Sequence, residues 1–124
     1  METLKAVLFS RHELVPKALK YLQQKGIEIV SQVTYVRDAD SALRIMAEYN
    51  ADVAIVIIPY SIIFQMQEKA PDIIYIQPYS QVLHKLPCPS DCKFNPETDW
   101  FHAGQHYRFI TFKKVKINIV LEDF

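Results

Sequence analysis

Both cysteines and three of the four histidines of this chain fall within one segment, residues 84–106. Cys88, Cys92, His102 and His106 follow the order C-x3-C-x9-H-x3-H, in which two thiols and two imidazoles occur as close pairs. Structural zinc sites take four ligands of these types in a tetrahedron. The spacing therefore predicts a structural zinc ion bound by these four residues. His84, which precedes Cys88 by four residues, is a spare ligand that could replace one of them.

His102 and His106 are four residues apart, so a helical turn over Phe101–Gln105 would place both imidazoles on one face. That turn is the local structure we expect here. Two alternatives to zinc stay open: Cys88 and Cys92 could form a small-loop disulfide, or they could be free thiols, with the histidines on the surface.

The segment resembles a Cys2His2 zinc finger only in part. The gap between the second cysteine and the first histidine is nine residues, whereas fingers use about twelve. Pro89 and Pro96 interrupt the segment, and no basic recognition helix follows it. Phe94, Trp100 and Phe101 are placed to shelter a metal ion. A structural clip is therefore a better interpretation than a DNA-reading finger.

A second set of candidate residues follows the strands of a predicted α/β core. Ligands of open α/β sheets bind outside the carboxyl ends of the strands, at the switch point, which here lies between the first and third strands. The residues expected at this rim are Ser10, Arg11, His12, Glu13, Tyr60, Ser61 and Tyr79. Arg11 would hold an anion, His12 would move a proton and Glu13 would orient it. A small anionic ligand is the expected occupant; alternatively, these polar residues only end strands and cap helices.

Alternating strand and helix patterns build this core. The apolar runs predict strands at Leu4–Phe9, Ile27–Val36, Val53–Ile58 and Ile73–Ile76. Helices are expected over about 15–25, from Asp38 or Asp40 to about Asn50, and from Ser61 to Ala70. Such alternation calls for right-handed βαβ units in a parallel sheet of order 2-1-3-4.

This order resembles a small flavodoxin-like or receiver-like three-layer α/β fold. The resemblance is one of topology. Receiver domains carry an acidic cluster at the strand ends, but Ser10, Pro59 and Gln77 stand there in this chain. The resemblance to receiver domains therefore does not predict a phosphoacceptor residue in this chain.

The pattern changes after the fourth strand, where prolines allow at most a helical turn over Ser80–Leu86. Two further β segments, Tyr107–Phe112 and Val115–Leu121, form either a hairpin or one long strand. We therefore expect an α/β core over residues 1–80 and a zinc-tied Cys/His-rich excursion over 81–106. Residues 107–124 would be a β segment that completes the same domain.

Composition excludes several classes of function. Lys and Arg number 14, and so do Asp and Glu, which disfavours a general nucleic-acid binder. Lys113, Lys114 and Lys116 beside aromatic residues keep weak nucleic-acid binding as an alternative. The two glycines form neither a dinucleotide-binding motif nor a Walker loop. Pro59 breaks the longest apolar stretch, so we expect no membrane span and a soluble, intracellular, cytoplasmic protein.

These observations predict a small binding or regulatory module rather than an enzyme. Residues 115–121, if they lie at a sheet edge, would pair with a second copy in a homodimer. The runner-up is a small hydrolase or transferase acting on a phosphorylated or nucleotide ligand. It would use the rim around Arg11 and His12.

Overall fold

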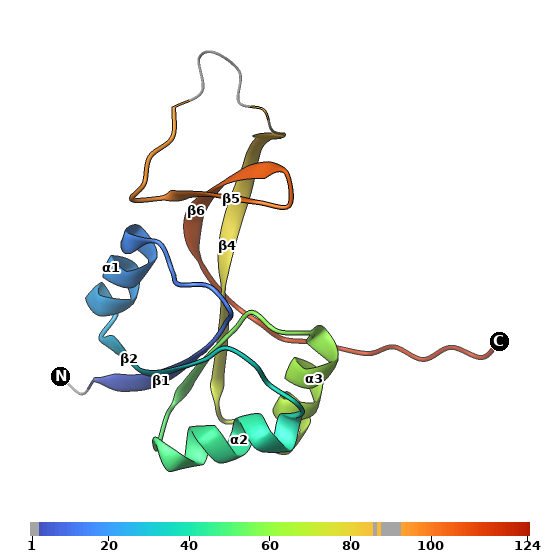
Figure 1. The fold of residues 1–124 in the computed structure, drawn as a ribbon. Helices are drawn as coiled ribbons and strands as arrows, with labels where there is room; N and C mark the ends of the chain where they lie inside the picture. The colour runs from blue at the N-terminus through green and yellow to red at the C-terminus, as the bar shows by residue number, and fades with distance from the viewer. Residues whose placement is uncertain (1–2, 86, 88–92) are drawn as a thin grey trace.

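The computed structural model describes residues 3–85, 87 and 93–124. In this part of the chain, six strands form one curled sheet of order β2-β1-β3-β4-β6-β5, with three helices packed on it (Figure 1). The elements are β1 (Leu4–Phe9), α1 (Pro16–Gln24), β2 (Ile27–Val33), α2 (Ala39–Glu48), β3 (Val53–Val56), α3 (Tyr60–Lys69), β4 (Ile74–Lys85), β5 (Asp99–His102) and β6 (Gln105–Lys114). Strands β1 to β4 run parallel in the predicted order, and β6 and β5 extend the sheet antiparallel.

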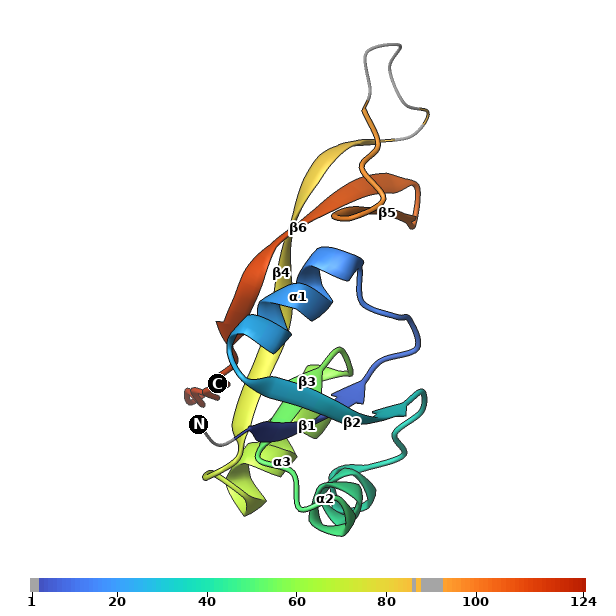
Figure 2. The same ribbon diagram turned by 90° about the vertical axis from the view of Figure 1, so that its left-hand side faces the viewer.

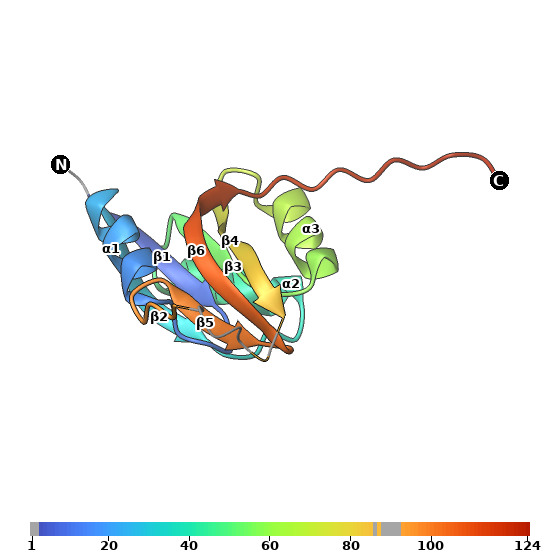
Figure 3. The same ribbon diagram turned by 90° about the horizontal axis from the view of Figure 1, so that it is seen from above.

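The apolar run of β1 is buried because helices cover both faces of the sheet. Ala6 and Leu8 face α1, while Val7 and Phe9 face α2 and α3. All four side chains are buried. Seen from above, α1 and the pair α2 and α3 lie on opposite sides of the strands (Figure 3). The parallel part of the sheet is therefore a three-layer core.

Local signals set the ends of α1 and α2 as the sequence predicts, whereas α3 begins at Tyr60, before the predicted Ser61, and has no side-chain cap. Pro16 occupies the first turn of α1, and Gly26 follows the helix with a φ of 72°, a left-handed conformation that glycine adopts without strain. The Asp38 side chain caps α2 by accepting a hydrogen bond of 2.8 Å from the amide of Ser41. No helix in the described ranges is long and apolar enough to cross a membrane.

Strand β4 corrects the prediction that the fourth strand ends at Ile76 and a helical turn follows. It runs on to Lys85, pairs with β3 only over Ile74–Ile76, and then pairs with β6 (Figure 2). Pro78 lacks an N–H group, but at this point the strand has already left β3, so no bond to that neighbour is lost. The pairing partner β6, distant in sequence, decides the structure of this segment.

The C-terminal segment corrects a second prediction. Lys113 and Lys114 lie within β6 rather than in a hairpin turn, and no strand is present from residue 115 onward. The backbone here bonds to a side chain instead of a neighbouring strand. Gln67 on α3 donates to the carbonyl of Val115 at 2.6 Å and accepts from the amide of Ile117 at 3.1 Å, and we call these two hydrogen bonds the Gln67 clamp. Beyond that clamp the chain extends away from the sheet (Figure 3).

Candidate functional site

A cleft of about 770 Å³ lies at the carboxyl ends of β1 and β3, where the sequence predicts a ligand site. It includes four of the predicted rim residues, Ser10–Glu13. Apolar side chains form most of the remaining wall. The lining consists of Ser10, Arg11, His12, Glu13, Leu14, Val15, Ala18, Thr34, Tyr35, Val36, Ile57, Ile58, Pro59, Pro78, Ser80, Trp100, Phe101, His102 and Phe109.

The loop that carries Arg11 and His12 is held in place by its own hydrogen bonds. The buried Ser10 hydroxyl donates to the carbonyl of His12 at 2.9 Å and accepts from its amide at 3.0 Å. The side chain of Gln32 on β2 donates to the carbonyls of Ser10 at 3.2 Å and His12 at 3.3 Å. Ser10 is therefore a positioning residue, and the exposed side chains of Arg11, His12 and Glu13 are left to meet a ligand.

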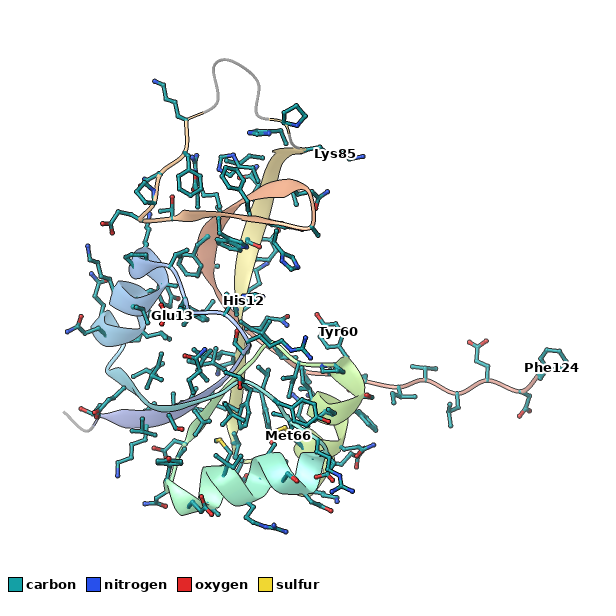
Figure 4. All side chains as sticks on the ribbon, viewed as in Figure 1. His12, Glu13, Tyr60, Met66, Lys85 and Phe124 are labelled. Atoms are coloured by element: carbon teal, nitrogen blue, oxygen red, sulfur yellow. The ribbon has the colours of Figure 1, made fainter. Side chains whose placement is uncertain are left out.

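The β5–β6 hairpin covers the cleft, which the sequence does not predict. Trp100 and Phe109 line it and pack on the α1 side of the core. His102 comes within reach of His12, with 5.7 Å between ring centroids in an edge-on arrangement. The imidazoles of His12 and His102, which are far apart in the sequence, thus lie together at the cleft. His12 is labelled in Figure 4.

Three predicted rim residues lie outside the lining of this cleft. Tyr60, labelled in Figure 4, begins α3. It is 59% exposed and donates a hydrogen bond of 3.3 Å to Gln77. Ser61 is exposed in the first turn of that helix. Tyr79 lies within β4 instead of at its end, with the ammonium of Lys113 3.8 Å from its ring centroid. The continuation of β4 is what carries Tyr79 away from the rim.

The two histidines predicted to share a helical face lie on opposite faces of a hairpin. The turn between β5 and β6 consists of Ala103 and Gly104, with φ angles of 49° and 73°, the positive values that tight two-residue hairpins require. His102 pairs with Gln105, and Phe101 pairs with His106. Successive side chains on a strand alternate between faces. The helical turn expected over Phe101–Gln105 is therefore wrong, and His102 does not converge with His106.

His106 instead meets His84, the spare ligand. The two residues pair across β4 and β6, and their nearest ring nitrogens, His84 Nε2 and His106 Nδ1, are 3.0 Å apart. The other nitrogen of the His106 ring, Nε2, is 2.9 Å from Oδ2 of Asp99. His106 and Asp99 are both buried. The hairpin thus presents His102 and Trp100 to the cleft and a buried histidine cluster on its other face.

Asp99 is the charged centre of that cluster. Burial alone would raise the pKa of its carboxyl, but hydrogen bonds from Arg108, Thr98, the amide of Asn95 and His106 outweigh burial and hold the pKa well below its ordinary value. Arg108 binds both carboxylate oxygens, at 2.8 and 3.0 Å. The carboxylate therefore stays ionised and fixes the imidazole of His106 in one orientation.

Two of the three rings that the sequence places around the predicted metal ion, Phe94 and Phe101, lie against this imidazole. Their ring centroids lie 5.6 and 5.1 Å from that of His106, and the two rings stack at 4.9 Å. Trp100, the third ring expected there, stacks on Tyr107 instead.

The two predicted thiol ligands, Cys88 and Cys92, lie outside the described residues. Among the residues that are described, no group of three or more His, Cys, Asp or Glu side chains is arranged to hold a metal ion. The predicted zinc site with His102 and His106 therefore stays a prediction, and the described structure places its two imidazoles apart.

Sequence reasoning missed Asp99, Arg108 and the covering role of Trp100. An acidic residue directly before two aromatic residues, Trp100 and Phe101, gives no signal that it is buried. Only the pairing of β5 with β6 brings Asp99 opposite Arg108. Comparison of the chain with protein-family models, curated proteins and solved structures found no match.

Proposed function

We propose that the protein is a small-molecule-binding module whose ligand occupies the strand-end cleft. The single observation that carries this proposal is the cleft itself, a concave space of about 770 Å³ at the carboxyl ends of the neighbouring strands β1 and β3. The helices that follow these two strands pack on opposite faces of the sheet. Ligand sites are usually concavities of about 300–1,000 Å³ with apolar walls and a few polar groups. The four parallel strands beneath it would then serve as a shortened flavodoxin-like scaffold.

The lining favours a ligand with a flat apolar body and an anionic group. Trp100, Phe109 and Ile57 offer apolar and aromatic surface to the body. Arg11 is the cation that could bind an anion, and His12 and His102 add nitrogen donors or acceptors beside it. Because Ser10 and Gln32 already fix the loop, little conformational entropy is lost when a ligand binds.

The probe 8-anilinonaphthalene-1-sulfonate tests this proposal because it combines aromatic rings with a sulfonate. Trp100 is the chain's single tryptophan and lines the cleft, so a probe bound there will accept its excitation energy. We expect saturable binding of one probe per chain with strong energy transfer. Absence of binding, or binding without energy transfer from Trp100, contradicts the proposal.

Matched variants separate the cleft from general surface binding. Ile57→Glu puts a negative charge on the cleft wall and should abolish probe binding, whereas Leu19→Glu changes a similarly exposed side chain outside the lining and should not. Arg11→Ala should weaken binding several-fold relative to Arg44→Ala. Each variant is first checked for an unchanged free energy of unfolding, because partly unfolded chains also bind this probe. Equal binding by all four variants would refute a site in the cleft.

A second candidate function is a small hydrolase or transferase acting on a phosphorylated or nucleotide ligand. The observation that favours it is the pair His12 and His102 beside Arg11, since two imidazoles and a guanidinium can supply a proton acceptor, a proton donor and an anion site. Release of phosphate from a generic aryl phosphate, lost in both His12→Ala and His102→Ala, would support it. Wild-type protein without such release leaves only the binding function.

We also propose that the C-terminal segment mediates self-association. Ile119, Val120, Leu121 and Phe124 are exposed at the end of an extended chain (Figure 4 labels Phe124). An apolar segment in extended conformation can add to the open edge of a sheet in a second copy.

A further inference from the structure

The contacts of His84 and His106 resemble those of two histidines that bind one metal ion. Metal-binding histidines donate their outer ring N–H to a carboxylate or a backbone carbonyl, which fixes the inner nitrogen toward the metal. In His106 the outer nitrogen Nε2 is 2.9 Å from the buried carboxylate of Asp99. In His84 the outer nitrogen Nδ1 is 3.1 Å from the carbonyl oxygen of Lys85. Both outer nitrogens therefore have the acceptors that metal-binding histidines use.

The donor and acceptor roles of the four ring nitrogens depend on the tautomers of the two imidazoles. If both outer nitrogens donate, a proton or a metal ion lies between the two inner nitrogens. Neutral imidazole carries one N–H group, so His84 Nε2 and His106 Nδ1 would then face each other with lone pairs across 3.0 Å. Only a shared proton or a metal ion makes that approach favourable. Two nitrogens bound to a tetrahedral zinc ion at about 2.0–2.1 Å lie roughly 3.4 Å apart. The observed separation is a few tenths of an ångström shorter, which a small ring rotation accommodates.

The surroundings favour a structural rather than an exchanging ion. His106 is fully buried, and Phe94 and Phe101 lie against its ring. Arg108 neutralises the charge of Asp99 through two hydrogen bonds, so the carboxylate orients the imidazole without competing for the metal. Two borderline nitrogen ligands suit zinc and its neighbours among the divalent transition metals. They would be two of the four ligands that a structural zinc ion takes, and the described residues place no third His, Cys, Asp or Glu side chain where it could bind the same ion.

We infer that His84 Nε2 and His106 Nδ1 are the imidazole ligands of a zinc site, and that His102 is not a ligand. This assignment differs from the one that sequence spacing suggests, because the hairpin turns His102 to the opposite face, toward His12. It is also independent of the proposed cleft function. Metal at the cluster and ligand in the cleft would use different faces of the same hairpin.

Metal titration of matched variants tests the assignment. Wild-type protein, stripped with a chelator and titrated with Zn²⁺ or Co²⁺ alone, should bind one ion per chain. His102→Ala should bind it with unchanged affinity, whereas His84→Ala should bind it at least about 100-fold more weakly, a larger loss than the 10–100-fold typical of an outer-sphere change. Retention of metal by His84→Ala, its loss from His102→Ala, or no binding by the wild type overturns the inference.

A second measurement needs no variant and so does not depend on the folding of one. Zinc-edge X-ray absorption of the wild-type protein detects imidazole ligands through scattering by the outer ring atoms. We expect two imidazoles at about 2.0–2.1 Å. One imidazole or none refutes the paired site. The half-buried position of His84 makes its alanine variant the one expected to fold, and near-native circular dichroism of that variant is required before its titration is interpreted.

Discussion

Replacing Asp99 by asparagine should destabilise the protein more than any other single change to a charged side chain in the β5–β6 region. The carboxylate is fully buried and accepts hydrogen bonds from Arg108, Thr98, Asn95 and His106, at distances of 2.6–3.0 Å. An amide of the same shape keeps one acceptor oxygen and turns the other position into a donor. Several donors would then face an NH2 group.

The size of the effect follows from the exposure of the partners. Removing one member of a buried ion pair costs about 3–5 kcal/mol because the other is left uncompensated. The side chain of Arg108 is 37% exposed and can regain some water, so the lower end, about 3 kcal/mol, is expected here. A domain of this size has about 5–15 kcal/mol of stability in total. The variant should fold, with a clearly lower urea midpoint.

Glu97→Gln is the matched control, two residues earlier in the chain. Glu97 forms an ion pair of 3.5 Å with Lys20 in which both side chains are more than half exposed, and such pairs contribute less than about 1 kcal/mol. Urea unfolding followed by the fluorescence of Trp100, with a chelator present, measures both variants. If Asp99→Asn loses no more stability than Glu97→Gln, the buried ion pair does not stabilise the hairpin.

The same pair of proteins gives a pH test with a definite sign. The pKa of Asp99 is lower in the fold than in the unfolded chain, where a carboxyl titrates near about 4. Its stabilising contribution is therefore complete above about pH 5 and is lost progressively as the pH falls through about 4 toward the folded-state pKa. The difference in unfolding free energy between wild type and Asp99→Asn should shrink from pH 7 to pH 3. A constant difference would show that the charge of Asp99 is not responsible.

Three further predictions concern the C-terminal segment and the hairpin turn. Gln67→Ala removes both hydrogen bonds that hold Val115 and Ile117. It should lower the free energy of unfolding by about 1–2 kcal/mol and speed amide hydrogen exchange at Ile117. The control Gln65→Ala, at an exposed neighbouring position, should leave that exchange unchanged; the same result for Gln67→Ala would contradict the role of these hydrogen bonds. Ala103→Asn gives the turn the Asn-Gly sequence that its positive φ angles favour. The variant should gain roughly 0.5 kcal/mol of stability, which raises the melting temperature by a few degrees. A lower melting temperature would mean that the turn has a different conformation. The full-length chain should show a mass that rises with concentration in sedimentation, and deleting residues 119–124 should abolish that rise. A full-length chain that stays monomeric at high concentration would refute the proposed self-association.

Local patterns determined the parallel core. The apolar runs of β1 and β3 are buried on both faces, and Pro16, Gly26 and Asp38 mark helix ends by their own backbone and side-chain preferences. Because a strand, a helix and a short loop are each specified within a few residues, strand order 2-1-3-4 and the rim at Ser10–Glu13 follow from the sequence.

Tertiary pairing decided the C-terminal third. Pro78 and a proline-rich stretch argue locally against a strand, yet β4 continues to Lys85 because β6 supplies its hydrogen bonds. A spacing of four residues puts His102 and His106 on one face of a helix but on opposite faces of a two-residue hairpin. The residue types in a sequence can therefore indicate metal chemistry, but which imidazoles meet depends on pairings between segments far apart in the chain. That is why His84 and Asp99 surround His106, and His102 faces His12.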